Sequence, residues 1–231
     1  MVERMKKIKT LEDLEDALDK ESAWRNKEIA QIKLKIANKI EVVNEGDRSQ
    51  PLTIEDKGLI LILYADWEGF INTSANLYVR FVFAQNVPLK DLKTGFWEIQ
   101  IHPSFENFKN ISSQKAKKEF LDNLRNQFSR TKYRGYANEH KKRYIGTNSN
   151  LNSATFMGIL DILGLNVNDF HLNSQFIDSL LLNYRNELAH GERGDDVKFS
   201  DMMDTVEHVR KLMNKFKESI IKAARDKLYL S

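Results

Sequence analysis

A short stretch around residue 185 carries the residues whose types and spacing suit phosphate chemistry. It reads Leu-Leu-Leu-Asn-Tyr-Arg-Asn-Glu-Leu-Ala-His-Gly over residues 180–191, so that Arg185 and Asn186 are adjacent and His190 follows closely. A guanidinium can bind a phosphate through two parallel hydrogen bonds. A histidine titrates near neutrality and can therefore take a proton from a hydroxyl group. These residue types predict phosphoryl chemistry that needs no metal.

The same residues favour RNA over DNA as the substrate. We expect Arg185 to stabilise charge that develops on the scissile phosphate, and His190 to withdraw the proton of a ribose 2′-hydroxyl. Asn186 lies one helical turn before His190 and can hold the imidazole in one orientation. Because the 2′-hydroxyl is the nucleophile, DNA is excluded as a substrate. A structural reading stays open, in which His190 caps a helix C-terminus and Arg185 forms an interface salt bridge.

A helix over about 174–190, ended by Gly191, must position these residues. At roughly 100° per residue it has one apolar arc that faces its own domain, made by Phe176, Ile177, Leu180, Leu181, Tyr184 and Leu188. Leu182 and Ala189 project to the far side with Asn186 between them. An apolar second face predicts a partner, so we expect a homodimer with a composite active site.

The rest of the chain predicts long helices, because its only prolines are at 51, 88 and 103. The expected helices are Thr10 to Val43 with Thr10 as N-cap, about Thr53 to Gln85 as the central helix, Ser112 to Ser129, Ser153 to Leu163, and Ser200 to Lys227 with Ser200 as N-cap. Glu68 places a carboxylate within the apolar central helix. A structural ion pair and a functional role are both open for it. Glu68, Tyr184 and Glu187 are candidate supporting residues.

The region from 87 to 153 interrupts this pattern and is expected to be a long insertion. The alternation Phe-Trp-Glu-Ile-Gln-Ile over 96–101 predicts a short strand or an ordered loop. Further on lies the most basic tract of the chain, with tyrosines interleaved, which suits phosphate contacts and base stacking. Its candidate RNA-binding residues are Arg130, Lys132, Arg134, Lys141, Lys142 and Arg143. A solvated insertion is the alternative interpretation.

Composition sets the remaining limits. The 231 residues contain no cysteine, which removes disulfides, thiolate nucleophiles and Cys-ligated metals and fits a cytoplasmic protein. No apolar run is long enough for a membrane span. The sequence Glu187-Leu-Ala-His190 matches one element of a di-iron site, but the second element that such sites need is missing, so no metal and no cofactor are expected.

These segments together resemble the HEPN superfamily. Arg185-Asn186-Glu-Leu-Ala-His190 near the end of the penultimate helix is similar to its Arg-polar-x-x-x-His signature. Trp24-Arg-Asn-Lys-Glu28 and Tyr64-Ala-Asp-Trp-Glu-Gly-Phe70 resemble the MAE-type HEPN-like nucleases in particular.

The resemblance implies an all-α, up-and-down helical bundle that forms one domain over 1–231 and dimerises through the motif helix. It implies catalytic roles for Arg185 and His190, a positioning role for Asn186, and RNA cleavage that leaves a 2′,3′-cyclic phosphate. Members commonly act as toxins or in anti-phage defence, which implies a cognate antitoxin or another partner protein. Some members are non-catalytic modules that bind RNA, nucleotide or protein, and this is the competing interpretation.

Overall fold

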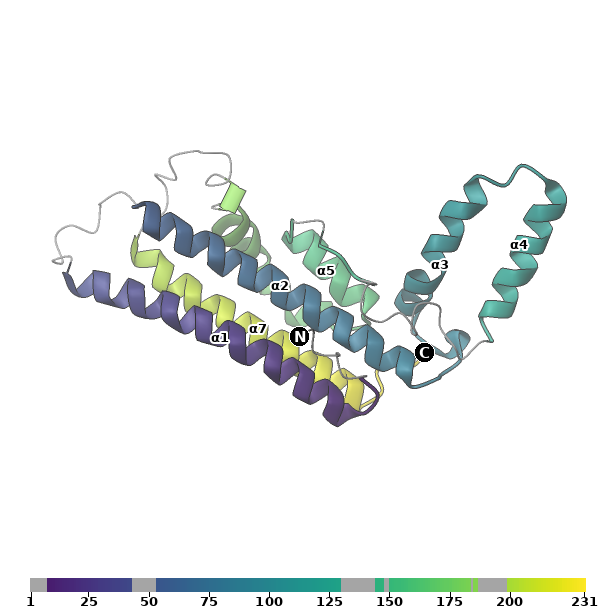
Figure 1. Cartoon of the computed structure of the whole chain (residues 1–231), viewed down its shortest axis with the longest axis horizontal. Helices are drawn as coiled ribbons and strands as arrows, with labels where there is room; N and C mark the ends of the chain where they lie inside the picture. The colour runs from purple at the N-terminus through teal and green to yellow at the C-terminus, as the bar shows by residue number, and fades with distance from the viewer. Residues whose placement is uncertain (1–7, 43–52, 130–143, 148–149, 184, 187–198) are drawn as a thin grey trace, which may run out of the picture.

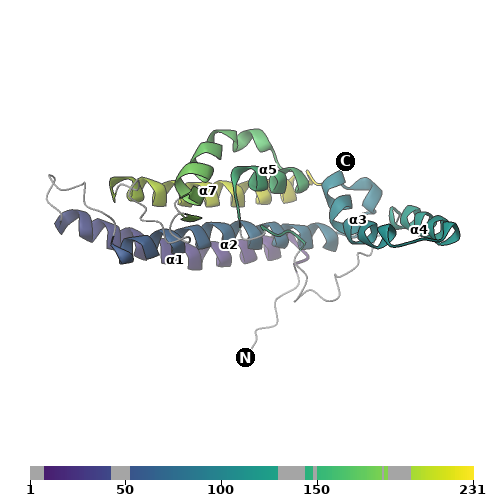
Figure 2. The same ribbon diagram turned by 90° about the horizontal axis from the view of Figure 1, so that it is seen from above.

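Three long helices packed lengthwise form the body of the protein (Figures 1 and 2). In this computed structural model they are α1 (Leu11–Val42), α2 (Ile54–Ala84) and α7 (Phe199–Arg225), and each contacts the other two. The structure describes residues 8–42, 53–129, 144–147, 150–183, 185–186 and 199–231. Over these residues the only β-type pairing is an isolated bridge between Leu92 and Leu230, so the predicted all-α class is confirmed.

Side-chain caps fix the starts of α1 and α2, as their sequences predict. Thr10 Oγ1 accepts a hydrogen bond from the Asp13 backbone N–H at 3.1 Å, and Asp13 accepts one from the Thr10 N–H. Thr53 and Asp56 form the same reciprocal capping box at α2. Each box satisfies backbone donors that a helix start would otherwise leave without partners.

The central helix α2 is buried around most of its circumference, which confirms its predicted place. Trp67, Phe70 and Tyr78 are fully buried, and Trp67 packs edge-on against Phe156 with ring centroids 5.2 Å apart. Burial of this many large side chains is the dominant contribution to the stability of such a bundle. The described helices include none that is long and apolar enough to cross a membrane.

A helical hairpin projects from one end of the body and contains most of the described residues of the region 87–153 (Figure 1). It consists of α3 (Thr94–Lys109) and α4 (Gln114–Gln127), preceded by the short 3₁₀ turn η1 (Leu89–Asp91). The two helices pack through aromatic pairs, with Trp97 against Phe128 at 5.0 Å and Phe108 against Phe120 at 4.9 Å.

The prediction of a strand or loop at 96–101 is wrong, because these residues belong to α3. Phe96 and Ile99 are spaced three residues apart and both are buried, and Phe96 packs edge-on against Tyr78 and Phe83 of α2. Tertiary packing therefore decides the structure here over the alternating pattern. Pro103 lies within the same helix and removes one backbone donor without ending it.

The other predicted helices are confirmed within a few residues. They are α4 with Ser113 as its N-cap and α5 (Ser153–Ile162) with Asn152 as its N-cap. Two 3₁₀ turns, η3 (Val167–Asp169) and η4 (His171–Asn173), lead from α5 toward the motif helix. The predicted N-cap at Ser200 is wrong, because α7 already begins at Phe199.

The motif helix departs from the expected α-helix. Residues Phe176–Asn183 form a π-helix, η5, and helical conformation continues at Arg185 and Asn186. A π-helix pairs residues five apart and winds more widely, so facial angles calculated at 100° per residue do not hold across it. Phe176 and Ile177 are buried as predicted. Runs of π-helix are rare and often occur at functional sites.

Candidate functional site

Arg185 lies beside the N-terminal half of α2, and its guanidinium is held on two sides. Its Nη1 donates to the side-chain oxygen of the adjacent Asn186 at 2.9 Å. Its Cζ lies 5.5 Å from the centroid of the Tyr64 ring, within the range of a cation–π contact. The guanidinium is therefore oriented by one polar and one aromatic neighbour.

Tyr64 is buried on α2, and its hydroxyl is itself held in place. The Tyr64 Oη accepts a hydrogen bond from the Leu151 backbone N–H at 2.8 Å. Burial raises the pKa of Tyr64, and the neighbouring Glu68 carboxylate adds to that rise, while the Leu151 N–H and Arg185 oppose it. The phenol consequently stays neutral at physiological pH.

Glu68 lies one turn along α2 from Tyr64, on the same face of the helix. The buried Thr147 hydroxyl donates to its carboxylate Oε1. Glu68 is close enough to Tyr64 to act on the pKa of the phenol, as does Arg185. An arginine, a carboxylate and a phenol thus converge at one place, which is the arrangement of a site that handles phosphate and protons.

A polar row on α2 extends this site along the helix. Asn76 continues the spacing of Tyr64 and Glu68, and its Oδ1 accepts from the backbone N–H groups of Tyr144 and Ile145 at 2.7 and 3.1 Å. Its Nδ2 donates to the Ile145 carbonyl at 2.9 Å. Residues 144–147 and 150–151 are thus attached to α2 at Asn76, Glu68 and Tyr64 in turn, and these residues are together called the strap below.

The family scan matches residues 14–229 to the model described as HEPN_MAE_28990-like HEPN. The chain belongs to this HEPN family. The predicted resemblance is therefore confirmed, and the match covers almost the whole chain. Neither the search of curated proteins nor the search of solved structures returned a match.

Arg185 and Asn186 are the two residues of the predicted Arg-Asn-x-x-x-His signature that lie within the described part of the chain, and their side chains are joined by a hydrogen bond. Several other predicted site residues lie outside the described residues: His190, Tyr184, Glu187, Ala189 and the basic residues Arg130, Lys132, Arg134, Lys141, Lys142 and Arg143. Leu182 lies within η5, but its side chain is also outside the description.

The sequence did not predict a role at the site for three residues, which are Tyr64, Thr147 and Leu151. Tyr64 and Glu68 are spaced four residues apart in a largely apolar part of α2, and this spacing places them on one face of the helix. The contributions of Thr147 and Leu151 depend on a contact across more than 75 residues of chain, which no local pattern reports.

An exposed apolar stripe lies on α2 beside Glu68. Ile54, Leu61 and Ile62 are 92, 37 and 47% exposed, and Gly58 and Ala65 fall on the same side of the helix. Glu68 follows at the end of this stripe. Uncovered leucine and isoleucine side chains in a row mark a surface suited to a protein partner.

A second charged cluster lies at the seam between α1 and α2. Arg25 donates to Asp66 Oδ1 at 3.0 Å and to Glu21 at 2.7 Å, and both Arg25 and Asp66 are buried. Burial and the neighbouring Glu28 carboxylate raise the pKa of Asp66 to about 6, although Arg25 opposes the rise. This cluster lies on the α1 side of α2, whereas Tyr64 and Glu68 face away from it.

The described part of the chain contains no cluster of His, Asp or Glu that could hold a metal ion.

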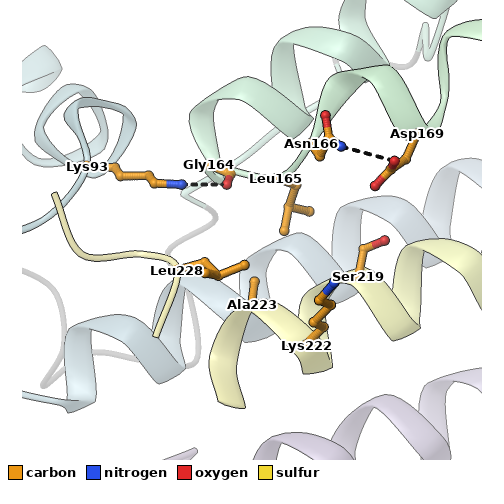
Figure 3. A pocket seen from close by; sticks show the side chains of 9 residues that line it. All are labelled: Lys93, Gly164, Leu165, Asn166, Asp169, Ser219, Lys222, Ala223 and Leu228. Carbon is orange, nitrogen blue, oxygen red and sulfur yellow. Dashed lines mark hydrogen bonds between the residues drawn. The ribbon is translucent and has the colours of Figure 1, made fainter. Parts of the chain in front are cut away.

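A pocket of about 440 Å³ opens where the turn after α5 meets the end of α7 (Figure 3). At one side of it Lys93 donates to the Gly164 carbonyl at 2.9 Å. The predicted site residues are not among those that line this pocket, so it is separate from the Arg185 site.

Proposed function

We propose that this HEPN protein is a metal-independent endoribonuclease. Arg185 binds the scissile phosphate, and His190 takes the proton from the ribose 2′-hydroxyl. The 2′-oxygen then bonds to phosphorus, the bond to the 5′-oxygen breaks, and the 5′-oxygen leaves with a proton. The products are a 2′,3′-cyclic phosphate and a 5′-hydroxyl end.

The observation that carries this proposal is the orientation of Arg185. Asn186 binds the guanidinium at 2.9 Å and Tyr64 lies under it, so the phosphate-binding group is set in place before substrate arrives. Preorganised charge of this kind is typically the largest contribution to catalysis of reactions that develop negative charge. A surface arginine with only a structural role would not need an aromatic face and an amide to orient it.

We propose further that the working unit is a homodimer with a composite active site. The stripe of Ile54, Leu61 and Ile62 supports this, because it is an uncovered apolar surface next to Glu68 and the Arg185 centre. Pairing two copies would bury it and bring two sets of Arg185 and His190 together. Leu182 and Ala189 of the motif helix are proposed to belong to the same interface.

The test is cleavage of RNA in EDTA by purified protein. Wild-type protein should produce 2′,3′-cyclic phosphate ends, while Arg185→Ala and His190→Ala should lose cleavage and keep the helical circular dichroism signal. Arg225→Ala is the matched control. Arg225 is the last residue of α7, is exposed, and pairs with Glu15 of α1. An oligonucleotide with a 2′-deoxy sugar at the cleavage site should bind and stay intact.

The second candidate function is a non-catalytic module that binds RNA, nucleotide or a partner protein such as an antitoxin or defence component. The exposed stripe on α2 favours it equally well, since a different protein could cover this surface. RNA binding without cleavage, unchanged by EDTA or added Mg²⁺, would support the module and contradict the ribonuclease.

A further inference from the structure

We infer that Tyr64 is a positioning residue, whose ring sets the guanidinium of Arg185 and is itself set by the strap. This inference rests on the proposed function for its effect on catalysis. The geometry that carries it is a chain of two contacts, from the Leu151 N–H to the Tyr64 hydroxyl and from the Tyr64 ring to Arg185.

The Tyr64 ring is fixed more firmly than packing alone would achieve. Only 3% of the residue is exposed, and the hydroxyl at the far end of the ring accepts from Leu151 at 2.8 Å. Held at both ends, the ring has little freedom to tilt. It therefore presents a constant face to Arg185, which is attached to a different element of the fold.

A cation–π contact is suited to hold a catalytic arginine. It uses the flat face of the guanidinium, whereas a phosphate is bound by N–H groups at the edge of the same plane. Asn186 holds one part of that edge through Nη1. The ring can consequently orient Arg185 without competing with a phosphate for the same hydrogen bonds.

The strap connects this arrangement to the predicted RNA-binding tract. The strap begins at Tyr144, directly after Arg143, and is attached to α2 at Asn76, at Glu68 and finally at Tyr64. The contact that fixes the Tyr64 ring is thus made by the same stretch of chain that continues from the basic residues.

The test varies the ring electronically while preserving its shape. Position 64 is replaced by phenylalanine and by phenylalanines with one, two or three fluorines, which weaken the negative ring face stepwise. The kcat for RNA cleavage should fall with each fluorine, by roughly 2-fold to 30-fold in total, while KM changes less. The same series at Tyr78, a buried tyrosine farther along α2, should leave kcat unchanged. A flat kcat across the position-64 series would overturn the inference.

A second measurement needs no catalysis. The guanidinium protons of Arg185, assigned with the Arg185→Lys variant, should show an upfield ring-current shift in the nuclear magnetic resonance spectrum. Tyr64→Leu should abolish this shift. Tyr64→Phe, which keeps the ring but loses the contact with Leu151, should reduce it, and this variant serves as the test if the leucine variant does not fold. If wild-type protein cleaves no RNA and the shift is present, the proposed function fails and the positioning role stands. If RNA is cleaved and the shift is absent, the positioning role is wrong.

Discussion

A Cβ atom on Gly69 would lie only 2.5 Å from Nη2 of Arg25. Gly69 on α2 thus gives the space in which the buried guanidinium of α1 meets Glu21 and Asp66. The charged cluster at the helix seam depends on the absence of one side chain, and it can be tested separately from the Arg185 site.

Gly69→Ala should lower the free energy of unfolding by about 1–3 kcal/mol, because Arg25 would have to move and weaken its ion pairs. Gly58→Ala is the control on the same helix, since a Cβ there meets nothing within 4 Å. Removing a glycine from a helix at such a position should stabilise by up to about 1 kcal/mol. Urea denaturation of both variants checks this, and equal effects of the two would contradict the role of Gly69.

Asp66→Asn should remove a pH dependence of stability between about pH 4 and 6. The pKa of Asp66 is about 6 in the folded protein, raised by burial and then by Glu28. A raised pKa gives a stabilising contribution that is complete below the unfolded value near 4, and this contribution is lost as the pH rises through 6. The Asn variant should therefore keep a nearly constant stability across this pH window, whereas the stability of the wild type falls. Thermal unfolding across this range measures the effect, and exposed Asp122→Asn should follow the wild-type curve.

Asn76→Leu should destabilise the protein and release the strap. The side chain of Asn76 makes three hydrogen bonds to Tyr144 and Ile145 and is 5% exposed. Leaving these backbone groups without partners should cost about 2–4 kcal/mol. Hydrogen exchange at the two amides should accelerate. The exposed Asn123→Leu on α4 should change neither quantity, and protected amides in the Asn76 variant would show that the strap is held by other contacts.

Replacing Lys141, Lys142 and Arg143 by alanine should weaken RNA binding and flatten its salt dependence, with turnover at saturating RNA nearly intact. The control removes the same charge from exposed Lys20, Lys27 and Lys211 on α1 and α7. Fluorescence anisotropy at several salt concentrations provides both values. An unchanged salt slope in the first variant would leave the tract as a solvated segment.

Leu61→Arg and Leu182→Arg should each turn a dimer into a folded monomer and reduce RNA cleavage with it, because two like charges would meet in an apolar interface. Leu34→Arg is the matched control, since Leu34 is a leucine that is 61% exposed and belongs to α1 instead of α2. Analytical ultracentrifugation gives the mass. A Leu61 variant that stays dimeric and active would exclude the stripe from the interface.

Local patterns predict the long helices of this chain well, and they predict its site only in part. The capping residues Thr10 and Thr53 predict where α1 and α2 begin. The many aromatic and aliphatic residues of α2 predict that it is the buried, central helix. The helix at 94–109 escapes prediction because packing of Phe96 on α2 overrides an alternating pattern. Tyr64 escapes it because its partners Leu151 and Arg185 are remote in sequence.

The π-helix before the signature has a consequence for how the signature is read. A π-helical turn accommodates about one residue more than an α-helical turn, so it absorbs an extra residue while the residues after it keep their side of the helix. If all the residues of Phe176–Asn183 wound as an α-helix instead, Arg185 would rotate by roughly 100° about the helix axis, away from Tyr64, and deleting one residue would bring it back. The length of this segment, as well as the identity of the signature residues, thus decides which way the arginine faces.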